Sequence, residues 1–259
     1  MAHDISDILR GWDYQPDELL VRMIEGEDGR LRMQLRLDLG VLQLECDGRP
    51  DGQRPEGFES WLDYYERQQQ RYDAANPEGP GYLLGAEDCA RLWREGAQYY
   101  HRYIGFYHLG MYEPCGRDTA RNLRLCLFIQ KHAADHRVKL QFDQWRPYAI
   151  MMNTRARAMP LVALGNLVEG LRLIDEGINA VHQFLEEHGQ ADHADQCIEL
   201  VSLQGWRAEV LERDGEVAIP GPHDQAEILR RKLDAAIAAE KFEEAARIRD
   251  EIRRLQLQP

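Results

Sequence analysis

The chain of 259 residues is 44% hydrophobic and 30% charged, which suits one or two domains of roughly 150 residues with cores of their own. No run approaches the ~18 consecutive apolar residues of a membrane-spanning helix, and the first ten residues lack the apolar centre of a signal peptide. We therefore expect a cytoplasmic protein without membrane contact. The five cysteines are scattered and form no Cys-x-x-Cys pair, which argues against a disulfide framework and a cysteine-rich zinc site.

The net charge of −13 is unevenly distributed along the chain. Residues 1–90 carry −11 and residues 159–223 carry −9, whereas residues 91–158 carry +7. Either these segments attract one another in the fold, or the basic segment binds an anionic partner such as nucleic acid. The first interpretation is favoured, because a free basic patch would act against the acidic field of the whole protein. The cations available for the second are Arg117, Arg121, Arg124, Lys131, Arg155 and Arg157.

Residues 1–57 are predicted to form an N-terminal region with a short helix and a β-hairpin. Between Leu31 and Leu37 apolar and polar residues alternate with the period of two of a half-buried strand. Residues 19–25 precede it across a Gly-rich turn, so the two runs predict the hairpin, and residues 41–46 could add a third strand. The segment 47–57 is rich in Gly and Pro and is expected to be a loop.

Residues 58–219 show helical spacing and predict a helical body, either a bundle or a stack of helical hairpins. A core stripe is expected on one of its helices, formed by Trp93, Ala97, Tyr100, Ile104, Tyr107 and Met111. Pro114 and Gly116 are expected to end that helix, and Leu123 and Leu127 to point inward from the next. The helices are expected at 58–75, 86–112, 118–133, 137–157, 161–188 and 194–213.

The C-terminal segment, residues 224–259, predicts an αα-hairpin after a Pro- and Gly-containing linker at 220–223. Asp224 and Glu227 have the spacing of a capping box, which marks a helix start. About 33 residues bury little surface alone, so one apolar face is expected to be kept for a partner. The overall fold class is therefore mainly α, with a small N-terminal antiparallel β region and a C-terminal helical hairpin.

The run from Leu233 to Ile252, LDAAIAAEKFEEAARIRDEI, resembles the UVR motif, the helical hairpin of the bacterial excision-repair proteins UvrB and UvrC. In that family the hairpin is a protein docking element, with related copies in Clp-type ATPases and their adaptors. The resemblance implies that the partner is another protein with a UVR-like hairpin, either an excision-repair protein or a Clp-type ATPase, or a second copy of this chain. The chain lacks the Gly-x-x-x-x-Gly-Lys-Ser/Thr loop that a helicase needs.

These features predict an adaptor that works by binding, without catalytic residues, cofactor or metal. Phe242 is the expected hot spot, because large apolar anchors dominate such interfaces. Two alternatives are a nucleic-acid-binding accessory factor in DNA repair that uses residues 91–158, and an enzyme of unrecognised class. The predicted partner-binding residues are Leu229, Leu233, Ile237, Phe242, Ala245, Ile248, Arg249, Asp250 and Ile252.

Three further groups have a chemical and a structural interpretation. His132 and His136 have the i, i+4 spacing of two metal ligands but also suit a solvated helix end. His188 and its polar neighbours around Gly189 are interpreted as a helix end followed by a loop. Cys115 lies near a predicted helix start with arginines, where positive potential would favour a thiolate, yet no paired base is visible.

Overall fold

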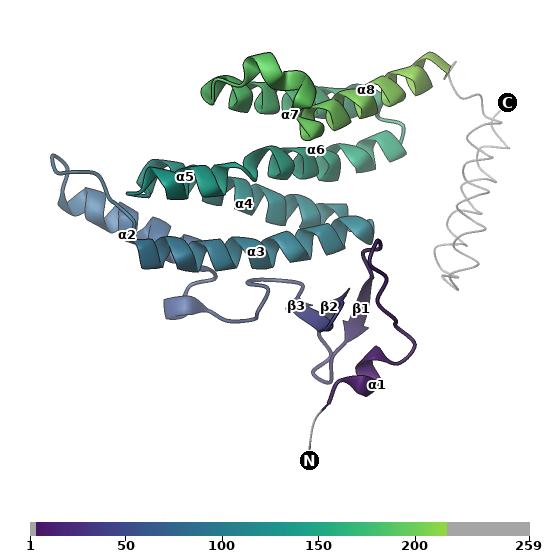
Figure 1. Cartoon of the computed structure of the whole chain (residues 1–259), viewed down its shortest axis with the longest axis horizontal. Helices are drawn as coiled ribbons and strands as arrows, with labels where there is room; N and C mark the ends of the chain where they lie inside the picture. The colour runs from purple at the N-terminus through teal and green to yellow at the C-terminus, as the bar shows by residue number, and fades with distance from the viewer. Residues whose placement is uncertain (1–3, 217–259) are drawn as a thin grey trace, which may run out of the picture. The chain divides into compact units, whose positions relative to one another are not determined.

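The structure is a computed structural model that describes residues 4–216, with side chains described as far as residue 212 (Figure 1). Within this range it contains eight α-helices and one three-stranded sheet, which confirms the mainly-α class with a small N-terminal β region. Residues 4–207 belong to one compact unit, which is described below. The hairpin predicted at 224–259 lies outside the described residues.

The N-terminal sheet follows a short helix, α1 (Ser6–Leu9), and has the strand order β1-β2-β3 with both pairs antiparallel. Its strands are β1 (Val21–Glu25), β2 (Leu31–Leu37) and β3 (Gly40–Glu45), so the predicted hairpin and third strand are confirmed. Met33 of β2 is opposite Met23 and Leu44. Because Met33 and Leu44 are buried, this register places one apolar face against the helices.

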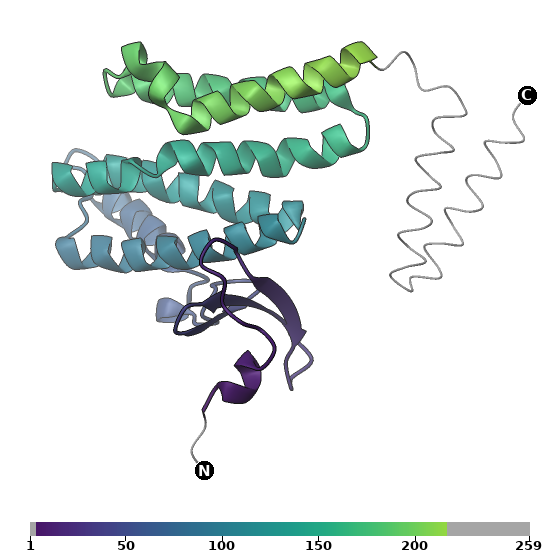
Figure 2. The same cartoon turned by 45° about the vertical axis from the view of Figure 1, so that its right-hand side comes forward.

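The helical part is a stack in which successive long helices pack on one another (Figure 2). The sheet packs against one side of α3, and α4 packs against the opposite side. Helix α4 then packs on α6, and α6 packs on α7. The short helices α2 and α5 contact α3 and α4 respectively. The helices are α2 (Trp61–Ala75), α3 (Ala86–His108), α4 (Tyr112–His132), α5 (His136–Asp143), α6 (Arg146–Ala163), α7 (Leu167–Glu187) and α8 (Ile198–Glu216), with 3-10 turns η1 (Pro55–Gly57) and η2 (Ala191–Gln196).

Three predicted helix boundaries are wrong, and a proline or glycine lies at each of them. Pro114 does not break a helix: it lies in the first turn of α4, where its missing N–H is not needed, and the chain turns instead at Gly110 with φ +70°. The predicted helix 137–157 is two helices, because Pro147 lies in the first turn of α6. The break predicted at residues 158–160 is also misplaced: α6 continues to Ala163 with Pro160 inside it, and the chain turns at Gly165, with φ +78°.

The predicted core stripe of α3 is also wrong by a rotation of about one residue. Trp93 and Tyr100 are only partly buried and Ala97 is exposed, whereas Leu92, Tyr99, Tyr103 and Phe106 are in the core. The buried face of α3 also carries Glu95 and Arg102, two charged residues that a hydrophobic pattern assigns to solvent. On α4, Leu127 is 57% exposed rather than inward, and Leu125 and Ile129 take the core positions.

Two clusters of buried side chains lie around the sheet and helices α2 to α6, and α7 and α8 bury further apolar residues, among them Ile174, Val181 and Leu203. The first joins α2, α3, α4 and α5 through Leu62, Leu92, Ile129 and Phe142. The second packs the sheet against α3, α4 and α6, with Met33 and Leu35 facing side chains that include Phe106 and Met152. The sheet and the helices therefore share a buried interior.

Glycine allows the closest approach of α6 and α7. A Cβ atom at Gly177 would lie 2.1 Å from Oγ1 and 2.8 Å from Cβ of Thr154, a stiff β-branched side chain. Gly205 in α8 has nothing within 4 Å of its Cβ position.

We predict opposite effects of alanine at these two glycines. Gly205→Ala should raise the free energy of unfolding by up to about 1 kcal/mol, because alanine favours the helix. Gly177→Ala should lower it by ~1–2 kcal/mol, since the clash with Thr154 outweighs the same gain. Urea unfolding monitored by circular dichroism measures both; stabilisation by Gly177→Ala would contradict the packing described for α6 and α7.

Candidate functional site

Four of the six cations assigned to an anionic partner are paired with carboxylates of the chain itself. Arg117 lies 2.8 Å from Asp47 and 3.1 Å from Asp118. Arg124 lies 2.6 Å from Asp63 and also contacts Glu66. The other two pairs are Arg121 with Glu95 and Arg157 with Glu176.

The remaining two cations differ from each other. Arg155 donates to Ser202 Oγ at 2.9 Å and lies over the Trp206 ring, so it joins α6 to α8 without a carboxylate. Lys131 is exposed near the end of α4. The structure thus does not gather the six cations into one open basic surface.

The ion pairs connect the basic segment to both acidic flanks. Arg117 and Arg124 reach residues of the N-terminal flank, and Arg157 reaches Glu176 of the following flank. Arg146 adds a further link to Glu187 at 2.5 Å. This pattern supports the interpretation that segments of opposite charge attract one another in the fold.

Glu95 is the centre of the most buried of these networks, with no exposed side-chain surface. Its carboxylate accepts from the backbone N–H of Trp61 at 2.7 Å and of Leu62 at 3.2 Å, so a residue of α3 caps the first turn of α2. Arg121 of α4 and Arg49, at 3.2 Å, supply the countercharge. Burial lowers the pKa of Arg121, and Glu95 counters this by favouring its charged form.

Arg102 and Asp118 make a second buried pair, each 1% exposed. The guanidinium binds the carboxylate through two hydrogen bonds of 2.6 and 2.9 Å. Its third nitrogen donates to the carbonyls of Glu45 and Gly48, both at 2.9 Å. One side chain therefore ties α3, α4 and the end of the sheet together.

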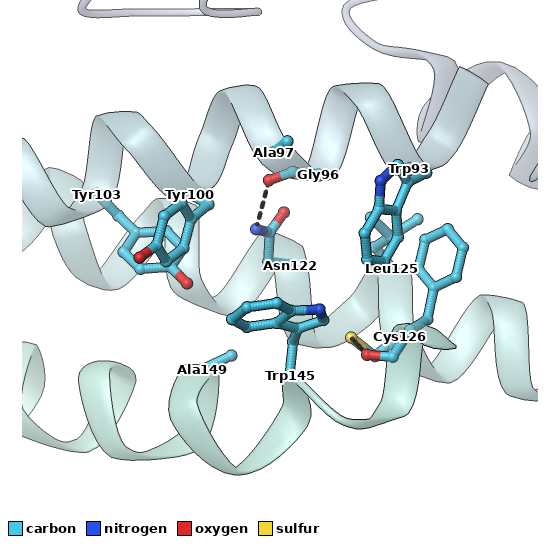
Figure 3. Close-up of a pocket in the computed structure, with 11 residues that line it drawn as sticks. Trp93, Gly96, Ala97, Tyr100, Tyr103, Asn122, Leu125, Cys126, Trp145 and Ala149 are labelled. Atoms are coloured by element: carbon cyan, nitrogen blue, oxygen red, sulfur yellow. Dashed lines mark hydrogen bonds between the residues drawn. The ribbon is translucent and has the colours of Figure 1, made fainter. Parts of the chain in front are cut away.

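An apolar pocket lies where α3, α4 and the start of α6 meet (Figure 3). Its volume is about 260 Å³ and its lining side chains are uncharged. Sequence analysis missed this pocket, because it assigned Trp93 and Tyr100 to a continuous core stripe. The lining residues are Trp93, Gly96, Ala97, Tyr100, Tyr103, Asn122, Leu125, Cys126, Phe142, Trp145 and Ala149.

The histidines considered as metal ligands do not converge. His132 is buried and its Nδ1 lies 3.1 Å from the Tyr82 carbonyl, whereas His136 is exposed. Within residues 4–216, side chains of His, Cys, Asp and Glu form no group of three or more that could hold a metal ion.

His188 is partly buried and pairs with the buried Asp143, a contact that the sequence interpretation as a loop cluster did not anticipate. Its Nε2 lies 2.8 Å from Asp143 Oδ2, and its Nδ1 lies 2.8 Å from the Phe184 carbonyl oxygen. A carbonyl can only accept, so Nδ1 carries a hydrogen. The contact with Asp143 then requires one further proton, held by either the imidazole or the carboxyl group.

Cys115 does not have the exposure or the lowered pKa of the reactive thiolate considered from the sequence. It is fully buried, and burial raises the pKa of its thiol to about 12. Burial likewise raises the pKa of Cys126, a pocket residue, to about 12. Both side chains are therefore neutral thiols in the core at physiological pH.

Comparison with known proteins identifies one part of the chain. The family model described as the UvrB/uvrC motif (UVR) matches residues 226–258, which confirms the resemblance noted in the sequence. No curated protein and no solved structure matches the chain. All nine predicted partner-binding residues fall within the matched segment, outside the residues that the structure describes.

One further finding concerns the described helices. Between residues 4 and 216, none is long and apolar enough to cross a membrane.

We predict that Glu95→Gln strongly destabilises the fold. The substitution leaves Arg121 and Arg49 buried without their carboxylate, and breaking a buried ion pair from one side costs about 3–5 kcal/mol. Arg124→Gln is the control: its side chain is 51% exposed, so we expect a change of at most about 1 kcal/mol. Denaturant unfolding of both variants measures the difference, and similar small effects would show that Glu95 is not a central contact.

We also predict a pH dependence that originates at Asp143. Burial raises the pKa of this carboxyl, so its contribution to stability is present at low pH and is lost as pH rises through the raised value. The difference in unfolding free energy between the wild type and Asp143→Asn should therefore fall as pH rises. Asp192→Asn, at an exposed site, controls for the loss of one negative charge. A difference that rises with pH would contradict the proton-sharing arrangement with His188.

Proposed function

We propose that the protein is a non-enzymatic adaptor that docks partner proteins through its UVR motif at residues 226–258. The family match is the observation that carries this proposal. The motif occurs in DNA-repair and Clp-type proteins and mediates protein interactions. A cytoplasmic location belongs to the same proposal.

The proposed partner is a protein with a similar hairpin, an excision-repair protein or a Clp-type ATPase, or a second copy of this chain. Residues 224–259 carry eight basic and eight acidic side chains, in contrast with the acidic segments elsewhere. Because this segment has no net charge, electrostatic repulsion does not oppose its apolar contact with a partner or its self-association. The proposed contact residues are Leu229, Leu233, Ile237, Phe242, Ala245, Ile248, Arg249, Asp250 and Ile252.

Nucleic-acid binding by residues 91–158 has less support from the structure. A phosphate would have to displace carboxylates from Arg117, Arg121, Arg124 and Arg157, and Arg121 is 9% exposed. We therefore keep protein docking as the single proposed function.

We predict that Phe242→Ala removes the partner. If Phe242 anchors the interface, its truncation should weaken association by ~2 kcal/mol, about thirtyfold in Kd. Tagged full-length wild type and Phe242→Ala are used to capture proteins from native lysate, with identification by mass spectrometry and sedimentation analysis for self-association. A chain ending at Pro222 gives the result expected for complete loss of docking.

Arg231→Ala is the matched control, because it truncates another long side chain of the same segment outside the nine proposed contacts. We expect it to retain the partner. A Phe242→Ala protein that keeps every partner of the wild type would refute the proposed interface, and an unchanged set of partners with the chain ending at Pro222 would refute docking through the motif.

A further inference from the structure

The pocket between α3, α4 and α6 is enclosed mainly by aromatic rings. Trp93 and Phe142 meet edge to face, with ring centroids 5.1 Å apart. Tyr100 lies 5.5 Å from Tyr103 and 6.2 Å from Trp145 between ring centroids. Figure 3 shows Trp93 and the two labelled tyrosines at opposite ends of the pocket, with the Trp145 indole between them. This arrangement offers ring edges and faces along the length of the cavity.

Small residues shape the pocket: a glycine lets α3 and α4 pack closely beside it, and two alanines leave the space itself unfilled. Gly96 allows α3 to approach α4 so closely that a Cβ atom there would lie 2.9 Å from Leu125. Ala97 and Ala149 line the same space with single methyl groups. Apolar space without an occupant is unfavourable, because the lining atoms lose dispersion contacts. The cavity thus suits an occupant that supplies those contacts.

The polarity of the lining restricts the occupant to a neutral molecule. A charge placed among these side chains would lose its hydration without gaining a partner of opposite sign. The Asn122 side chain is already engaged: it donates to the Gly96 carbonyl at 3.0 Å and accepts from Arg121 at 3.0 Å. Tyr100 and Tyr103 carry hydroxyl groups at one end of the pocket (Figure 3), which can bond a single polar group of an occupant.

The size of the pocket indicates a ring system larger than benzene. An apolar cavity of ~150 Å³ is enough for benzene, and this pocket measures about 260 Å³. The half-exposed Trp145 and the exposed Ala97 mark the side on which the pocket meets solvent.

We propose that this pocket is a binding site for a small neutral bicyclic aromatic molecule, of the indole or naphthol type, with its one polar group directed at the Tyr100 and Tyr103 hydroxyls. Ring stacking and edge contacts supply the affinity, and the absence of charge in the lining supplies the selectivity. The site is independent of the proposed docking function, since it uses only residues 93–149.

The test is isothermal titration of the full-length protein with indole, which should bind saturably at one site. Ala97→Phe places a ring in the pocket from its exposed rim and should weaken binding at least tenfold. Ala90→Phe is the matched control, because Ala90 is exposed on the same helix, two turns earlier, and does not line the pocket. Indole-3-acetate and tryptamine, which carry charges of opposite sign, should each bind at least tenfold more weakly than indole.

A second variant, Trp145→Ala, removes a half-exposed wall and should also weaken binding, while thermal unfolding confirms that each variant is folded. Binding of indole by Ala97→Phe with wild-type affinity would overturn the proposal. So would the absence of binding up to the solubility limit of indole, or equal affinity for either charged analogue.

Discussion

The carboxylate of Glu95 is the contact on which the arrangement of the N-terminal half depends. It accepts two backbone N–H groups at the start of α2 and faces Arg121 of α4 and Arg49 of the preceding loop, all at a site closed to solvent. Each of these groups would be costly to bury alone, so they stabilise the fold only as a set. The Arg102–Asp118 pair repeats this arrangement further along α3 and fixes the end of the sheet.

These networks explain why a basic central segment does not imply a nucleic-acid-binding protein. Its arginines pair with carboxylates of both acidic flanks, as in Arg124–Asp63 and Arg157–Glu176. Two further pairs, Arg102–Asp118 and Arg121–Glu95, lie within the segment itself and are removed from water. A phosphate backbone binds through cations that release counterions, and cations already paired inside a fold release none. The ion pairs thus link the basic segment to its acidic flanks in the folded chain.

The sequence predicted secondary structure well wherever apolar residues alone decide the pattern. Alternation identified β2, and helical spacing with Gly and Pro punctuation identified the long helices. The predicted buried face was wrong where charged residues are buried or apolar residues are exposed. On α3, Glu95 and Arg102 are buried, and on α4, Leu127 is exposed, so the buried face of each helix differs from the predicted one. The pocket could not be predicted, because it exists only where three helices place their aromatic side chains together, whereas the UVR motif could, because its chemistry lies within one contiguous run.

Small residues have two roles in this stack: some allow neighbouring elements to pack closely, and others line the open pocket. At Gly105 and Gly177 a Cβ atom would meet Met33 or Thr154 at under 2.5 Å, so glycine there closes the contact between neighbouring elements. At Ala97 and Ala149 the small side chains face a cavity of about 260 Å³ that remains open between aromatic walls. A stack that needed only stability would fill that space with leucine or phenylalanine, as it fills the core around Leu92 and Ile129. Close contacts join α3 to β2 and α6 to α7, so loose packing of the whole body does not account for the cavity between α3, α4 and α6. Binding of a small aromatic ligand is the role that we propose for it.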